Sequence, residues 1–85
     1  MTPAVFSHVR VGDTLTVKEE YLTRGGQSGT VTEVFGNGAA LDFFRDVFGD
    51  PKGLPTIEYW EWGELDPDGC GMALLLRAEK AGVVV

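Results

Sequence analysis

Hydrophobic and polar residues alternate with a period of two along several short stretches of the chain, the pattern of half-buried β-strands. In the first stretch, Leu15 and Val17 share one side, and the threonines and the lysine take the other. The later stretches are rich in β-branched and aromatic residues, which favour strands. The predicted strands are residues 14–18, 30–35, 40–44 and 56–62.

The segment Met72–Arg77 consists of residues that favour a helix. Because four strands precede it, we expect it to close the sheet as a fifth strand. A single 3₁₀ turn is expected at Gly63–Leu65, and residues 45–55, with two glycines and two prolines, are expected to form a loop. The pattern therefore predicts an all-β fold, a small and partly open barrel of about five strands.

Glycines in residues 25–38 raise the question of a phosphate-binding loop. Such a loop joins a strand to a helix and carries a lysine, whereas here a strand follows and no Gly-Lys-Ser or Gly-Lys-Thr occurs. We therefore interpret these glycines as turn and bulge positions that exclude a Cβ atom. The predicted structural turn residues are Gly12, Asp13, Gly26, Gly29, Asn37 and Gly38.

The hairpin after residue 35 has two candidate registers. A two-residue turn at Asn37-Gly38, with positive φ angles, would set Glu33 opposite Asp42, where like charges repel. A three-residue loop over 36–38 would set Val31 opposite Phe43, and we prefer it, although a bulge would rescue the first register.

The length of 85 residues allows one domain with a thin core. We expect it to span residues 1–85, with the core at about 9–78 and a tail at 79–85. The single cysteine, Cys70, cannot form an intramolecular disulfide, which favours a reducing compartment. With no secretion leader visible and no apolar run long enough for a bilayer, the expected location is the cytoplasm, without membrane contact.

The formal net charge is −6, and the region from Asp46 to Asp68 holds seven acids against Lys52 alone. Such a surface disfavours nucleic acid and favours a basic peptide or another protein as partner. The lysines and arginines are scattered singly along the chain: Arg10, Lys18, Arg24, Arg45, Lys52, Arg77 and Lys80.

The residues give little support to site chemistry. His8 and Cys70 are isolated potential ligands without metal-binding spacing, and no pair of carboxylates stands out. A nucleophile would need a base, and His8 is the only histidine. We expect no enzyme activity, no cofactor and no metal.

Residues 57–65 carry the most informative pattern, because aromatic and acidic residues cluster there. Exposed aromatics beside carboxylates bind basic peptides and alkylated ammonium groups, and tryptophan often dominates interfaces. In the alternative interpretation, one tryptophan fills the core and the other lies under the segment Met72–Leu76. The predicted contact patch is Tyr59, Trp60 and Trp62 with Glu58, Glu61 and Glu64.

A resemblance follows from the Gly-Asp turn, the strand after it and the Gly-x-x-Gly-x-Val-x-x-Val stretch. These residues resemble the opening of SH3-like small barrels of the KOW type; the matching positions are Gly12, Asp13, Val17, Gly26, Gly29, Val31 and Val34. The continuation to Leu65 is similar to small bacterial barrels of unknown function, and distantly to the barrels of the nitrile hydratase β subunit and of a peripheral photosystem I subunit. The resemblance covers about residues 9–66, and its motifs mark turns and core positions.

Three functions are therefore expected in order of preference. The first is a non-enzymatic protein-interaction or accessory module. The second is an RNA- or ribosome-associated KOW-like domain, although RNA-binding members are basic around the glycine loop and this loop offers only Arg24. The third is a non-catalytic subunit of an enzyme complex. Self-association through Val83–Val85 is also left open.

Overall fold

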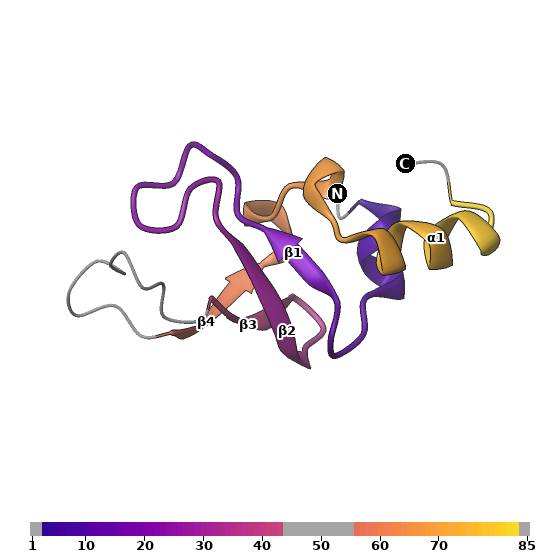
Figure 1. The fold of residues 1–85 in the computed structure, drawn as a ribbon, viewed down its shortest axis with the longest axis horizontal. Coiled ribbons are helices and arrows are strands. Elements are labelled where there is room, and N and C mark those ends of the chain that lie inside the picture. Colours follow the sequence, from indigo (N-terminus) through magenta and orange to yellow (C-terminus); the bar gives the residue numbers. More distant parts are fainter. Residues whose placement is uncertain (1–2, 44–55, 84–85) are drawn as a thin grey trace.

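The computed structural model describes residues 3–43 and 56–83, so the loop predicted at 45–55 and the last two valines lie outside the described residues. Four antiparallel strands form one sheet in the order β1-β2-β3-β4 (Figure 1). The strands are β1 (Thr14–Thr16), β2 (Ser28–Val34), β3 (Gly38–Asp42) and β4 (Ile57–Glu61). The helical elements are η1 (Ala4–His8), η2 (Trp62–Glu64), η3 (Pro67–Gly69) and α1 (Met72–Lys80), of which the η elements are 3₁₀ helices.

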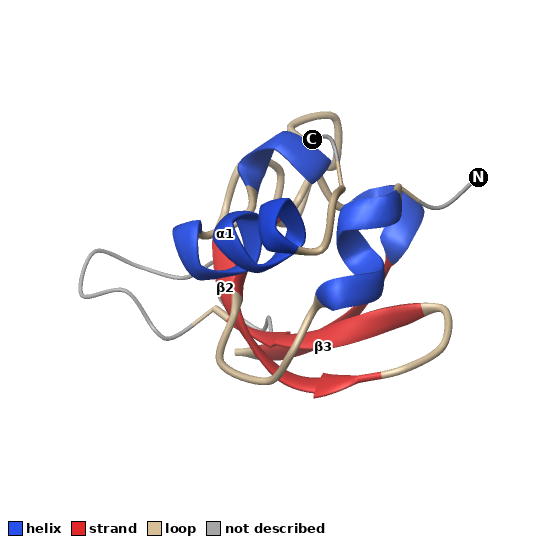
Figure 2. Cartoon of the chain, turned by 90° about the vertical axis from the view of Figure 1, so that its right-hand side faces the viewer, coloured by secondary structure: helices blue, strands red, loops and turns tan. Residues whose placement is uncertain are grey.

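The described residues are mostly β, as expected, and their four strands form a sheet that is not closed. The barrel of about five strands stays a prediction. The helical segments gather on one side of the sheet (Figure 2). A single bridge between Val17 and Leu65 joins the chain after β1 to the chain after β4. The 3₁₀ turn expected at 63–65 is present one residue earlier, as η2.

The prediction that Met72–Arg77 forms a strand is wrong, because this segment lies in helix α1. The free edge of β1 is already occupied by the preceding segment: Asp66 N donates to Thr16 O and Gly71 N to Thr14 O, each at 2.8 Å. With that edge filled, the helix-forming residues follow their own preference. Leu74 and Ala78, four residues apart, bury the same helical face.

The core lies between the inner face of the sheet and the helical layer. It begins earlier than the expected residue 9, because Val5 and Phe6 of η1 are also buried. Among the described residues, the buried apolar ones are Val5, Phe6, Val9, Leu15, Val17, Val31, Ala39, Leu41, Phe43, Trp60, Trp62, Leu65, Leu74 and Ala78.

The β2–β3 hairpin adopts neither of the registers considered. Phe35 N donates to Gly38 O at 2.8 Å, so the turn is Gly36-Asn37. The register then shifts between Val31, opposite Leu41, and Glu33, opposite Ala40. This shift is a bulge, and it removes the expected Glu33–Asp42 repulsion while keeping Val31 on the buried face.

The predicted turn glycines fall into two groups. Gly12 and Gly26 have φ angles of +97° and +79°, which confirms them as turns. Gly29 and Gly38 lie inside strands without positive φ, which corrects their assignment as turn residues. At Gly38 a Cβ would clash with the carbonyl oxygen of Trp60, so close strand packing explains this glycine.

Candidate contact surface

Strand β4 directs alternate residues of the predicted contact patch to opposite sides of the sheet. Ile57 and Tyr59 are 52% and 48% exposed, whereas Trp60 is 8% exposed. Their cross-strand partners agree, since Tyr59 lies opposite Ala40 and Trp60 opposite the fully buried Ala39. The outer face of β4 therefore presents Ile57, Tyr59 and Glu61.

The two tryptophans are core residues, which answers the question that the sequence left open. Trp62 is 7% exposed and stacks on Phe6, with ring centroids 5.3 Å apart, while its Nε1 donates to Gly36 O at 3.0 Å. Trp60 contacts the ring of Tyr21 edge-on at 5.6 Å. Because both tryptophans are buried in the core, both leave the predicted contact patch.

Phe35 takes their place, because it pairs with Tyr59 on the outer face. The two rings meet edge-to-face, with centroids 5.5 Å apart and planes at 70°, and Phe35 is 42% exposed. Gly38 lies between them in the sheet, and a Cβ there would come within 2.9 Å of the Tyr59 hydroxyl. Sequence reasoning missed Phe35 because its face depends on the turn and the bulge.

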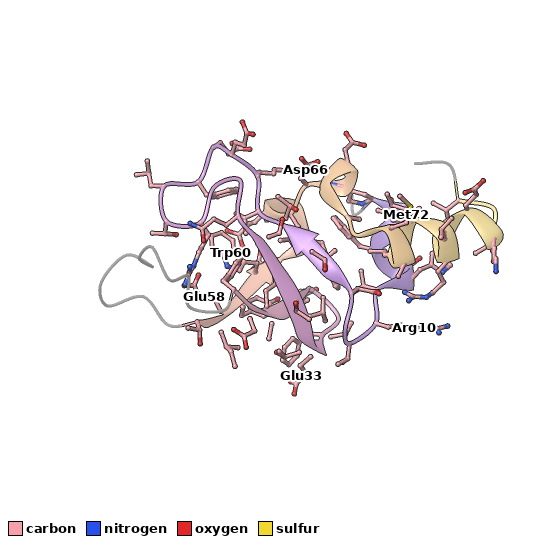
Figure 3. The ribbon with its side chains drawn as sticks, viewed as in Figure 1. Arg10, Glu33, Glu58, Trp60, Asp66 and Met72 are labelled. Carbon is pink, nitrogen blue, oxygen red and sulfur yellow. The ribbon has the colours of Figure 1, made fainter. Side chains whose placement is uncertain are left out.

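Carboxylates flank this aromatic pair. Glu33 and Glu61 are exposed and lie on the same face, opposite Ala40 and Gly38, and Figure 3 shows Glu33 projecting away from the ribbon. Strands β2, β3 and β4 contain no lysine or arginine. We call Glu33, Phe35, Ile57, Tyr59 and Glu61 the outer-face patch.

Glu64 lies beside this patch without belonging to the strand. Its Oε1 accepts a hydrogen bond of 2.9 Å from Glu61 N, and the Glu61 side chain accepts one in return from the Glu64 backbone. This reciprocal capping box fixes the start of η2 and holds two carboxylates at the end of β4.

Glu58, the remaining member of the predicted patch, faces inward and forms an ion pair. Its Oε2 lies 3.1 Å from Nε of Arg24, whose side chain is fully buried, and its Oε1 accepts from Trp60 Nε1. The Arg24 guanidinium also donates to Gln27 Oε1 at 3.1 Å and lies 4.5 Å from the Phe43 ring centroid. The one base of the glycine loop is thus a structural residue that holds this loop to β4.

The bases are less scattered in space than along the chain. Arg10, Arg77 and Lys80 join His8 around a pocket of about 390 Å³ beside the C-terminal end of α1. Arg77 donates to both carboxylate oxygens of Asp13, at 2.7 and 3.1 Å. Burial alone raises the pKa of Asp13, but hydrogen bonds from Arg77 and from Arg10 N outweigh it, so the pKa lies below its ordinary value.

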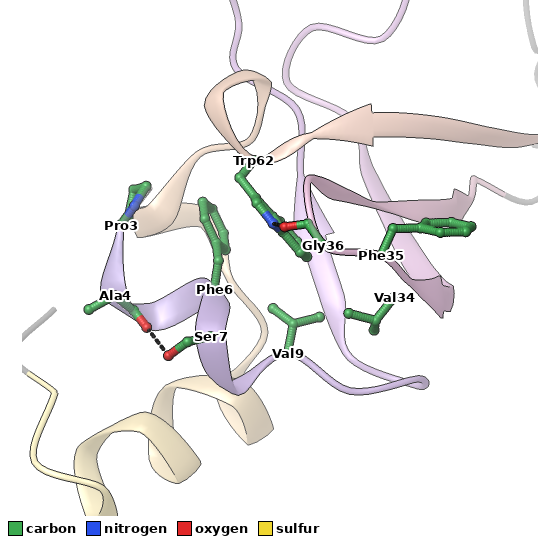
Figure 4. Close-up of a pocket in the computed structure, with 9 residues that line it drawn as sticks. All are labelled: Pro3, Ala4, Phe6, Ser7, Val9, Val34, Phe35, Gly36 and Trp62. Carbon is green, nitrogen blue, oxygen red and sulfur yellow. Dashed lines mark hydrogen bonds between the residues drawn. The ribbon is translucent and has the colours of Figure 1, made fainter. Parts of the chain in front are cut away.

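A second, apolar pocket of about 360 Å³ adjoins the outer-face patch (Figure 4). It lies between η1 and the β2–β3 turn, and Trp62 and Phe6 form its inner wall. The lining residues are Pro3, Ala4, Phe6, Ser7, Val9, Val34, Phe35, Gly36 and Trp62.

The thiol of Cys70 is a weak nucleophile. Burial, reinforced by the nearby Asp66, raises the pKa of the Cys70 thiol to about 11, so little nucleophilic thiolate forms near neutral pH. Within residues 3–43 and 56–83, no three His, Cys, Asp or Glu side chains gather closely enough to hold a metal ion. Nor does this part of the chain contain a helix with the length and hydropathy that crossing a bilayer requires.

Compared with known proteins, the sequence matches no family profile and no curated protein, and no solved structure matches it.

Proposed function

We propose that this protein is a protein-interaction module that binds a cationic partner through its outer-face patch. The observation that carries the proposal is the exposed Phe35–Tyr59 pair, flanked by Glu33 and Glu61 on strands without any base.

The chemistry of the patch fits lysine and arginine side chains. The edge-to-face arrangement leaves part of each ring open, and an ammonium or guanidinium over an aromatic ring gains about 0.5–1 kcal/mol at an exposed site. The carboxylates Glu33 and Glu61 add charge complementarity, which raises the association rate and disfavours anionic partners. The chain's net charge of −6 acts in the same direction at longer range.

The finer assignment of the fold to an SH3-like barrel of the KOW type belongs to the same proposal. The Val17–Leu65 bridge supports it, because this contact links the two ends of the sheet as a barrel closure would. The RNA-associated alternative would depend on the basic pocket around Arg10 and Lys80, since Arg24 is buried. The role of a non-catalytic enzyme subunit would use the outer-face patch.

The test is a titration of the ¹⁵N-labelled protein with defined peptides, followed by NMR. The cationic series consists of octapeptides in which Lys or Arg alternates with Val, Thr or Tyr, and the control series carries Glu at the charged positions. We expect the cationic series alone to shift amide signals of β2–β4, with an affinity that falls as salt rises.

Matched variants connect binding to the patch. Tyr59→Ala is expected to lower the affinity for the tightest-binding cationic peptide by about fivefold. Leu76→Ala removes a comparably exposed apolar side chain of α1 (50% exposed) and should leave binding unchanged. Equal weakening by both variants, or shifts centred on α1, would contradict the proposal, as would equal binding of the two peptide series.

A further inference from the structure

The edge of β4 away from β3 has no strand beside it among the described residues. Hydrogen bonds at both ends of β4 establish which backbone groups face β3: Phe43 N donates to Thr56 O at 2.7 Å, and Trp62 N donates to Asn37 O at 3.1 Å. In an antiparallel pair such bonds recur at every second residue. Glu58 and Trp60 therefore bond to β3, and the N–H and C=O groups of Ile57 and Tyr59 point to the open edge.

The opposite edge of the sheet, along β1, is covered by another segment of the chain. Beyond β1, the backbone of residues 65–71 pairs with the strand, through the Val17–Leu65 bridge and through the bonds from Asp66 and Gly71. Strand β4 has no such cover within the described residues, and it contains none of the lysines, prolines or bulges that commonly protect an edge. An edge of this kind is a template for strand addition.

We propose that an extended, basic peptide segment of the partner adds to this edge as a further strand beside β4. This inference rests on the proposed function and specifies how the partner is held. The main-chain groups of Ile57 and Tyr59 supply hydrogen bonds, and alternate partner side chains lie over the outer-face patch. In a segment with lysine or arginine at every second residue, the cationic side chains then lie over Tyr59 and beside Glu61 and Glu64. The residues between them point to the other face of the sheet.

Charge selects a basic segment over a second copy of this protein. Each chain carries a net charge of −6, and Glu61 and Glu64 stand at the end of the exposed edge. Pairing β4 with β4 would bring two such chains together without a compensating base in either strand. A cationic strand neutralises these carboxylates instead.

The experiment uses the best cationic octapeptide and two N-methylated forms of it. One form blocks the odd-numbered amides and the other blocks the even-numbered amides. An added strand bonds its neighbour with every second residue, so only one form should lose binding, by about tenfold or more, while the other binds like the parent. Equal binding of both forms would overturn strand addition while leaving the proposed function intact. Absence of binding by the parent peptide would refute both.

Two variants of the protein test the same edge from the other side. Ile57→Pro removes an N–H that does not bond to β3, at the first residue of the strand, where proline is tolerated. Ile57→Ala removes the side chain and keeps the N–H. NMR spectra first establish that both variants fold. The proline variant should then bind the cationic octapeptide about fivefold to tenfold more weakly than the alanine variant. Equal affinities would overturn the proposal, and so would a concentration-dependent dimer in light scattering that Ile57→Pro abolishes.

Discussion

Replacing Arg24 by methionine removes a guanidinium that is fully buried, while keeping an unbranched apolar chain of similar reach. The charge is held by Glu58 Oε2 and Gln27 Oε1, each at 3.1 Å, and it lies over the ring of Phe43. Removing one partner of a buried ion pair costs about 3–5 kcal/mol, because the other charge stays behind unpaired. Glu58 is 15% exposed, so water compensates it in part, and we expect a loss of about 3 kcal/mol.

This loss is large against the stability of so small a domain. For 85 residues the free energy of unfolding is expected at roughly 4–13 kcal/mol. A loss of about 3 kcal/mol should lower the Tm by about 12–24 °C. The measurement is urea unfolding followed by tryptophan fluorescence, which reports on the two buried tryptophans, together with a thermal melt.

Two further variants make the test specific. Arg10→Met removes an exposed base and should change stability by about 0.5 kcal/mol or less. The double variant Arg24→Met/Glu58→Gln should lose less free energy of unfolding than the two single variants lose together. The difference should be about 1 kcal/mol or more, because the two side chains are in contact. A loss below about 1 kcal/mol for Arg24→Met, or strict additivity with Glu58→Gln, would refute the structural role of Arg24.

Three other predictions test the fold. Gly38→Ala should prevent stable folding, since its Cβ would clash with the backbone of β4. Gly36→Ala has open space around its Cβ and should melt at the same temperature as the parent. Similar thermal melts of the two variants would contradict the packing of β3 on β4. In urea unfolding, Leu74→Ala should lower the free energy of unfolding by about 2–5 kcal/mol, and Leu76→Ala should lower it by less than about 0.5 kcal/mol. The reason is that, of these two leucines, only Leu74 is buried in α1, and the reverse order would contradict the helix. For Asp13, whose folded pKa lies below the ordinary value of 3.8, the stabilisation is complete above the unfolded pKa and is lost as the pH falls through the folded pKa. Asp13→Asn should therefore be less stable at pH 7 and lose less stability on acidification below pH 4, and parallel pH profiles would exclude this role.

The local sequence pattern predicted those features that depend only on a residue and its neighbours in the chain. The alternation around Leu15 and Val17 predicted a buried strand face, and both side chains are fully buried. Gly12 and Gly26 were predicted as turns because only backbone sterics matter at such positions. The absence of lysine and arginine from residues 28–42 is likewise a property of the sequence alone.

Tertiary contacts decided the features that depend on residues far apart in the chain. Whether Met72–Arg77 forms a strand or a helix depends on which segment pairs with the edge of β1, and residues 65–71 occupy that edge. The faces of Tyr59 and Trp60 were ambiguous because alternation shows only that they differ; packing against Phe6 and Tyr21 buried the tryptophans. Phe35 joined Tyr59 because the bulge in β2 sets the register of the hairpin, and a shift of one residue moves a side chain to the other face.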